Sequence, residues 1–131
     1  MQANTLTLHA LMLASLATVS VAHAASAPQI AAGRTIFQNN CASCHTVDAK
    51  LSPLAGPGLF GVVGRKASGV PGFNYSSAPA WTRAELEVFL LDPARRVPGT
   101  TMPVGLPDKK MRTALIDYLA TLKGPAGAAD R

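Results

Sequence analysis

The stretch Gln38–Val47, QNNCASCHTV, holds the only two cysteines of the chain, with a histidine directly after the second one. The three residues are Cys41, Cys44 and His45, so their spacing is i, i+3, i+4. In a helical turn this spacing places all three side chains on one side. The motif therefore predicts a site that uses two thiols and one imidazole together.

Three chemistries are compatible with such a turn. A thioredoxin-like disulfide would need a strand-rich scaffold around C-x-x-C, and the rest of this chain offers helices and loops. Structural zinc needs four ligands, so two carboxylates would have to complete the set. The third is C-x-x-C-H haem attachment, in which the two thiols add to the porphyrin vinyl groups and the imidazole binds the iron. It uses every cysteine, and it predicts haem c on Cys41 and Cys44 with His45 as an iron ligand.

Residues 1–24 have the character of a cleaved export signal. The apolar run Leu6–Val21 leads into Ala22-His23-Ala24, a small-x-small signature for cleavage after Ala24. The run contains Thr and Ser and is at or below the roughly 20 residues that a membrane span needs, so an uncleaved anchor is the weaker alternative. We expect residues 25–131 to form one domain in the periplasm, without a membrane span. Because the other two histidines lie in the signal, His45 is the only imidazole left in that domain.

The formal net charge of +5 lies entirely in residues 25–131, because residues 1–24 contain no charged side chain. The sequence has no arginine-rich helix and no run of like charge, which speaks against nucleic-acid binding. An acidic protein partner fits this charge better.

Periodic apolar residues predict three helices, over 28–39, 82–91 and 108–123. Thr82 and Glu85 have the spacing of a capping box at the start of the second helix, and Pro93 is expected to end it. Residues 46–80 are rich in Gly, Pro and Ser and show no periodicity, and residues 95–105 are also expected to be irregular. So long an irregular stretch is unusual in a compact domain unless the chain wraps around a cofactor. The fold class is therefore predicted to be all-α.

A second iron ligand is sought among two methionines, Met102 and Met111, since the other two lie in the signal. Met111 falls on the apolar stripe of the last predicted helix, where a flexible core residue is the better interpretation. Met102 lies between Pro98-Gly99 and Pro103, where no helical stripe needs it. We therefore expect Met102 to bind the iron opposite His45. Such a pair leaves no open position for a substrate, which predicts an electron carrier and not an enzyme.

These motifs resemble class I cytochrome c, of the mitochondrial and photosynthetic bacterial type. The match runs from Gly33 to about Leu122, through GRTIFQNNCASCHTV, GPGLFGVVGRKASGVPGFNYS, FLLDPARRVPGTTM and LIDYL. The resemblance implies the class I fold, with three main helices and long loops wrapped around one covalently bound haem.

The resemblance also assigns expected roles to single residues. Gly33 and Phe37 match first-helix positions that cross the last helix at Leu115 and Tyr118. The carbonyl of Pro57 is expected to accept the second ring N–H of the proximal histidine.

Further matches concern the rim of the haem. Arg65, Tyr75 and Trp81 match donors near the haem propionates, and Thr100 matches a threonine that helps hold the methionine loop. Phe89 departs from the family, because it stands where a tyrosine usually hydrogen-bonds the methionine sulfur.

The family's ring of lysines around the exposed haem edge is thinned here. Arg95 and Arg96 match two of its positions, and Lys66, Lys109 and Lys110 are further candidates for steering an acidic partner.

The function implied is that of a monomeric periplasmic shuttle in a respiratory chain, carrying single electrons from a quinol-oxidising cytochrome complex to an oxidase, reaction centre or reductase. Two alternatives remain open at this point. One is a ligand-binding or peroxidase-like haem protein, if Met102 leaves the iron easily. The other is a haem subunit permanently docked on a dehydrogenase.

Overall fold

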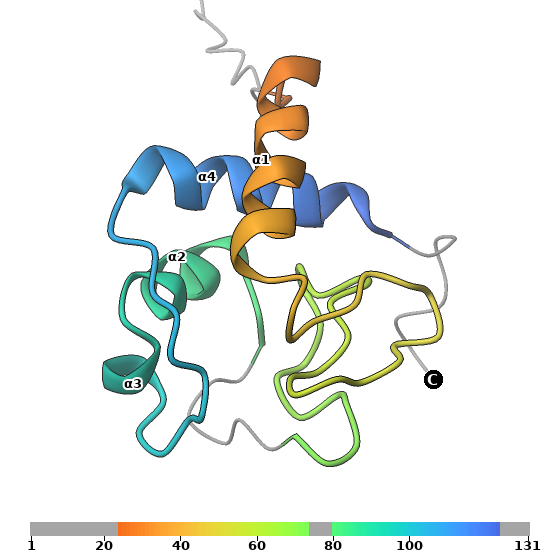
Figure 1. The fold of residues 1–131 in the computed structure, drawn as a ribbon, viewed down its shortest axis with the longest axis vertical. Coiled ribbons are helices and arrows are strands. Elements are labelled where there is room, and N and C mark those ends of the chain that lie inside the picture. The colour runs from red at the N-terminus through yellow and green to blue at the C-terminus, as the bar shows by residue number, and fades with distance from the viewer. Residues whose placement is uncertain (1–23, 74–79, 124–131) are drawn as a thin grey trace, which may run out of the picture.

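The computed structural model describes residues 24–73 and 80–123, and within these ranges the chain is helical with long loops. Its helices are α1 (Ala27–Asn40), α2 (Arg83–Leu91), α3 (Pro93–Arg96) and α4 (Lys109–Thr121) (Figure 1). Pairing between extended segments is limited to two isolated bridges, Lys66 with Ala80 and Val70 with Phe73, in these ranges. The predicted all-α class is confirmed. The predicted export signal and Tyr75 lie outside the described residues.

The three predicted helices begin where the sequence supplies a capping side chain. Ser26 accepts a hydrogen bond from the Gln29 amide at 3.4 Å, and Asp108 accepts from the amides of Lys110 and Met111 at 2.7 and 3.0 Å. These contacts satisfy amides that have no partner inside the helix. Predicted and observed bounds of these helices agree to within two residues.

The capping box at α2 is only half formed. The Thr82 hydroxyl accepts from the Glu85 amide at 3.1 Å, as predicted. In a complete capping box the Glu85 side chain would accept a hydrogen bond from the Thr82 amide. Here the Glu85 carboxylate instead forms an ion pair with Arg96 at 2.6 Å. The side chain predicted to cap α2 therefore ties α2 to α3 instead.

The sequence pattern does not predict helix α3, because in that pattern Pro93 only ends α2. Pro93 also starts a new turn, since its fixed φ suits the first position of a helix. The Asp92 carboxylate caps this turn by accepting from the Arg95 amide at 3.1 Å. The segment before Met102 is therefore partly helical.

Helices α1 and α4 cross in direct contact (Figure 1). A Cβ atom on Gly33 would lie 2.0 Å from the carbonyl oxygen of Ala114 and 2.7 Å from the Cβ of Tyr118, so only glycine fits at this crossing. One turn later the rings of Phe37 and Tyr118 pack with their centroids 5.9 Å apart. The predicted contact of Gly33 and Phe37 with the last helix is confirmed, with Ala114 as the closest neighbour of the glycine.

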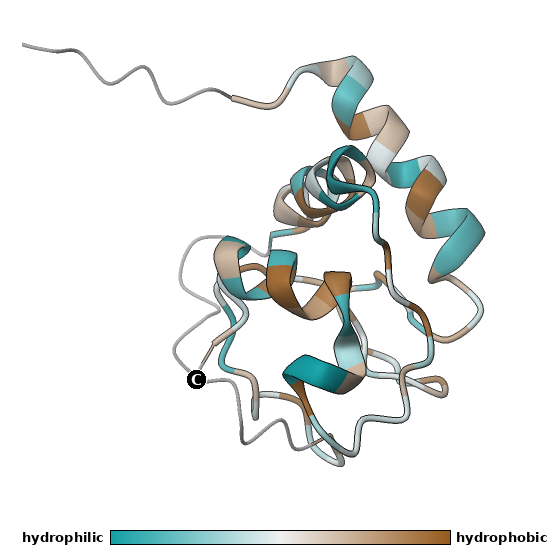
Figure 2. Ribbon diagram, turned by 90° about the vertical axis from the view of Figure 1, so that its left-hand side faces the viewer, coloured by the Kyte–Doolittle hydropathy of each residue, from teal (hydrophilic) through white to brown (hydrophobic). Residues whose placement is uncertain are grey.

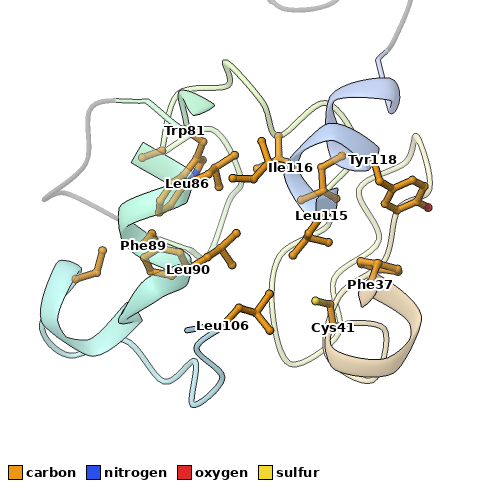
Figure 3. Packing of buried hydrophobic residues seen from close by; sticks show 14 residues of the cluster. Phe37, Cys41, Trp81, Leu86, Phe89, Leu90, Leu106, Leu115, Ile116 and Tyr118 are labelled. Carbon is orange, nitrogen blue, oxygen red and sulfur yellow. The ribbon is translucent and has the colours of Figure 1, made fainter. Parts of the chain in front are cut away.

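Helix α2 packs on α4 and completes the hydrophobic core. Its apolar stripe of Leu86, Phe89 and Leu90 is buried. Hydrophobic colour follows much of α2 in Figure 2, whereas the short α3 is hydrophilic. Figure 3 shows these side chains facing Leu115 and Ile116 of α4, both of which are 1% exposed. Helix α4 thus packs against both α1 and α2.

The segment from Thr46 to Phe73 is irregular, as predicted, and main-chain hydrogen bonds fasten it to the rest of the molecule. The Leu59 amide donates to the Thr46 carbonyl at 2.8 Å, and the Gly61 amide donates to the Leu122 carbonyl at 2.6 Å, at the end of α4. The Trp81 amide donates to the Arg65 carbonyl at 2.8 Å. These bonds hold the loops around a central space.

Candidate functional site

The cysteine motif forms a turn that continues α1. The amides of Cys44 and His45 both donate to the Cys41 carbonyl, at 3.0 and 2.9 Å. Both cysteines are free thiols, Cys41 buried and Cys44 half-buried. The turn thus brings the two thiols and the imidazole together, as the spacing predicted.

A cavity opens beside this turn. The empty space within it, including a part open to solvent, is about 590 Å³. Cys41 and His45 line it from one segment, Met102 from another, and α2 and α4 supply apolar walls. The remaining lining residues are Pro57, Leu59, Val62, Arg65, Trp81, Leu86, Phe89, Leu90, Leu115 and Leu119.

His45 is held by a hydrogen bond between its Nδ1 and the Pro57 carbonyl, 2.8 Å apart. A carbonyl can only accept, so Nδ1 must carry the proton, and Nε2 of the neutral ring then keeps its lone pair. A Cβ on Gly56 would come within 2.3 Å of the His45 ring, so the ring rests directly on glycine backbone. The expected partnership of His45 with Pro57 is present, and it leaves one ring nitrogen able to bind a metal.

Met102 is half-buried and packs against the hydrophobic core. Its amide donates to the Thr100 hydroxyl at 3.3 Å, so Thr100 braces the loop just before the methionine. Met111, by contrast, also packs against the core but lies outside the cavity. The structure therefore places Met102, and not Met111, in the same cavity as His45.

Two of the three expected propionate donors line the cavity, while the third, Tyr75, lies outside the described residues. Trp81 is 5% exposed, and its ring packs against Phe89 with the centroids 4.9 Å apart. Arg65 donates from its two terminal nitrogens to the carbonyls of Phe60 and Gly58, at 2.9 Å each. Arg65 thus also organises the loop that carries it.

The geometry weighs against two of the chemistries that the motif allowed. Burial, and to a smaller extent the neighbouring Cys44, raises the pKa of Cys41 to about 11. A redox-active thiol needs the opposite shift. Within residues 24–73 and 80–123, His, Cys, Asp and Glu side chains do not come together in any group of three or more that could hold a metal ion, which disfavours zinc.

Haem fits the residues that are present. The lining of the cavity is mainly apolar. Cys41 lies in its wall, and Cys44 follows one turn later. The imidazole of His45 and the thioether of Met102 also line the cavity. Two wall residues, Leu59 and Val62, were missed by sequence reasoning because they lie among glycines without periodicity. The only available signal was the apolar run LFGVV, which lies in a segment otherwise rich in turn residues.

The basic residues expected to meet a partner differ in their environments. Lys66, Arg95, Lys109 and Lys110 are exposed. Arg96 is only partly exposed and pairs with Glu85. Separately, no helix in the described part of the chain has the length and apolar character that crossing a bilayer requires.

Comparisons with known proteins agree with this site. The family model Cytochrome c matches residues 30–123. Cytochrome c type-1 of Ascaris suum is 42% identical over 93 residues, which is 66% of this chain and 82% of that protein. Cytochrome c2 of Rhodopila globiformis is 42% identical over 97 residues, covering 70% of this chain and 91% of that protein.

A solved structure, cytochrome cH from Methylobacterium extorquens, superposes with a TM-score of 0.62 at 37% sequence identity. The match covers 70% of this chain and 97% of that one. The class I all-α fold and the covalent haem c on the C-x-x-C-H motif follow from these matches together with the cavity. The chain belongs to the cytochrome c family, whose members carry covalent haem c and transfer electrons with it.

Proposed function

We propose that this protein is a periplasmic one-electron carrier in which His45 and Met102 would hold the haem iron. The observation that carries the proposal is that both side chains line one cavity, next to Cys41. When bound, haem c supplies an iron that gains or loses one electron. If both side chains bind the iron, they leave no position for a substrate, which favours a carrier over an enzyme.

The residues of the cavity have distinct parts in this proposal. The hydrogen bond to Pro57 fixes the tautomer of His45 and raises its basicity as a ligand. Thr100 braces the segment that presents Met102. Arg65 and Trp81, with Tyr75, are proposed to receive the propionates, whose burial would be costly without donors. The apolar walls reduce the contact of the site with water.

Replacement of Met102 by Ala tests the proposed ligand, with Met111→Ala as the matched control. In Met102→Ala we expect the near-red charge-transfer band of ferric iron bound to a thioether to disappear. We also expect the reduction potential to fall by a substantial part of the roughly 0.8 V range that axial ligands set. Met111→Ala should keep both properties, because Met111 lies outside the cavity. The band in the absorption spectrum and a redox titration measure the two effects.

Two results would contradict this assignment. If Met102→Ala keeps the band, Met102 is not the ligand. If the reduced native protein binds carbon monoxide rapidly at neutral pH, the methionine bond is labile and a ligand-binding haem protein becomes the better assignment. Phe89 makes the second result worth testing, because it lines the cavity without the hydroxyl that a tyrosine would offer.

We further propose that residues 1–24 are removed on export and that residues 25–131 form the mature domain. In support, cleavage after Ala24 would leave intact the Ser26 cap of α1. The mass of the purified protein tests this together with haem attachment. It should equal residues 25–131 plus one haem held by two thioethers, and a mass without haem would refute the whole proposal.

The proposed partner is an acidic redox protein, with Lys66, Arg95, Lys109 and Lys110 as exposed steering charges. Arg96 is a weaker candidate because it already pairs with Glu85. Steering by charge predicts an electron-transfer rate that falls as ionic strength rises. Stopped-flow measurements with an acidic redox partner would show this fall, and a rate independent of salt would contradict it. Sizing of the natively expressed protein separates a free monomer from a subunit docked on a dehydrogenase.

A further inference from the structure

One charged side chain of α4, Arg112, is buried in the protein interior, with 7% of the residue exposed. Arg112 does not line the cavity and is not one of the candidate partner contacts, and no role assigned above uses it. Burying a guanidinium is costly unless its donors are satisfied, so its contacts indicate what it does.

The Arg112 guanidinium joins α2, α4 and the methionine loop, residues 97–108. Its Nε donates to the Glu87 carboxylate of α2 at 2.9 Å. Its Nη1 donates to two carbonyls of the loop, those of Leu106 and Pro107, at 2.7 and 2.8 Å. The Thr113 hydroxyl donates to the other oxygen of Glu87 at 3.0 Å, so that the carboxylate is held from two sides.

These contacts fix the methionine loop at residues after Met102, whereas Thr100 braces the loop before Met102. Leu106 is 5% exposed, and its amide donates to the Leu90 carbonyl at 2.7 Å. Figure 3 shows its side chain near Leu90 in the buried cluster. Both main-chain polar groups of Leu106 are therefore satisfied, one by α2 and one by Arg112. Met102 precedes this anchor by only four residues, which limits how far its sulfur can move.

We infer that Arg112, oriented by Glu87, is a positioning residue that keeps the Met102 sulfur in the haem cavity. The inference rests on the proposed ligation of the iron by Met102. A rival ligand can bind only when the loop is open, so its apparent affinity is reduced by the fraction of open protein. Removing the guanidinium leaves two loop carbonyls without their donor, which raises that fraction.

The test is a titration of the ferric, haem-loaded protein with imidazole. Arg112→Leu should bind imidazole roughly tenfold more tightly than the parent, the factor expected for losing one or two buried hydrogen bonds. The matched control is Arg83→Leu, which removes the other guanidinium that links α2 to α4, through Asp117 at 2.5 Å. Arg83→Leu should stay within about threefold of the parent, since its partner lies on α4 and not in the loop.

Denaturant unfolding of the same proteins separates positioning from general destabilisation. The inference is overturned if Arg112→Leu binds imidazole like the parent or like Arg83→Leu. The inference is also overturned if other variants with the same unfolding free energy as Arg112→Leu show the same gain in imidazole affinity. If Arg112→Leu does not accumulate, Arg112→Lys decides, because one ammonium cannot serve Glu87 and both carbonyls in the fork geometry of arginine. A parent-like affinity in Arg112→Lys would then refute the inference.

Met102→Ala in the same titration distinguishes failure of this inference from failure of the proposed ligation. If Met102 is the ligand, Met102→Ala should bind imidazole more tightly than any other variant, because the position is already open. Parent-like affinity in Met102→Ala would show that the ligand assignment is wrong. Tight binding there, combined with parent-like binding in Arg112→Leu, would refute the role of Arg112 alone.

Discussion

The crossing of α1 and α4 and the loop wall of the cavity are stabilised in different ways. At the crossing, protein packs on protein, with Gly33 against Ala114 and Phe37 against Tyr118. The wall formed by residues 46–73 contains only turns and isolated bridges in its described part, and one side of it faces the cavity. The first region has its packing partner within the chain. The second lines the cavity that the haem would fill.

This difference has an energetic basis. Fixing each residue of an irregular loop costs about 1–2 kcal/mol of backbone conformational entropy. A helix offsets this cost with a continuous ladder of hydrogen bonds and a packed face, whereas the main-chain bonds among the wall residues are separate turn contacts, such as that from the Val62 amide to the Leu59 carbonyl at 3.1 Å. The apolar side chains of the wall that line the cavity, Leu59 and Val62, can bury further surface against the bound haem.

The largest expected effect comes from removing the cofactor. A chain with Cys41→Ser and Cys44→Ser cannot form the thioethers, and we expect it to be largely disordered, because the wall would have no core to cover. Circular dichroism and amide hydrogen exchange should show loss of protection throughout residues 46–73, with any residual protection in α1 and α4. A cooperative unfolding transition in the haem-free chain would contradict the comparison.

A smaller effect is expected from breaking the helix crossing while leaving the haem in place. Gly33→Leu would force a side chain into space already occupied by the Ala114 carbonyl, at a cost of about 3 kcal/mol or more in unfolding free energy. Ala31→Leu is the matched control, because Ala31 is exposed on the same helix. Unfolding in guanidinium chloride measures the free energy of unfolding of both variants. Equal stability of the two variants would show that the crossing is not closely packed.

The smallest of the three effects is expected at the wall itself. In Gly56→Ala the new methyl group would lie 2.3 Å from the His45 ring, and a loop can shift to relieve this more easily than two packed helices can. We expect the free energy of unfolding to fall by about 1–2 kcal/mol. The reduction potential should rise, because a weakened bond to Pro57 makes His45 a poorer electron donor to the iron.

The exposed neighbour provides the control for this last variant. Ala55→Val changes an exposed side chain of the same loop, so its potential should equal that of the parent. If Gly56→Ala has the parent potential as well, the glycine does not set the position of His45.

Sequence reasoning was most successful where a function depends on neighbours in the chain. The turn of Cys41, Cys44 and His45 and the Thr82 cap of α2 are both local patterns. The bond from His45 to Pro57 was expected only from the family resemblance, since nothing in the spacing of 12 residues specifies it.

What sequence reasoning missed depends on contacts between distant segments. Arg112 resembles any helical surface arginine until Glu87, 25 residues away, is placed beside it. Asp117 is likewise buried only because Arg83 and Gln29 reach it from two other helices. Apolar periodicity identifies the face that meets the core, and it contains no information about charged partners inside the fold.

The hydrogen bond from the Gly61 amide to the Leu122 carbonyl, at 2.6 Å, couples the length of the last helix to the shape of the haem pocket. The last carbonyls of a helix have no hydrogen-bond partner within it. Here one of them accepts a bond from the segment that places Val62 in the pocket wall. A chain shortened to end before Leu122 would therefore lose more than a frayed terminus, because the pocket wall would be released at the same time.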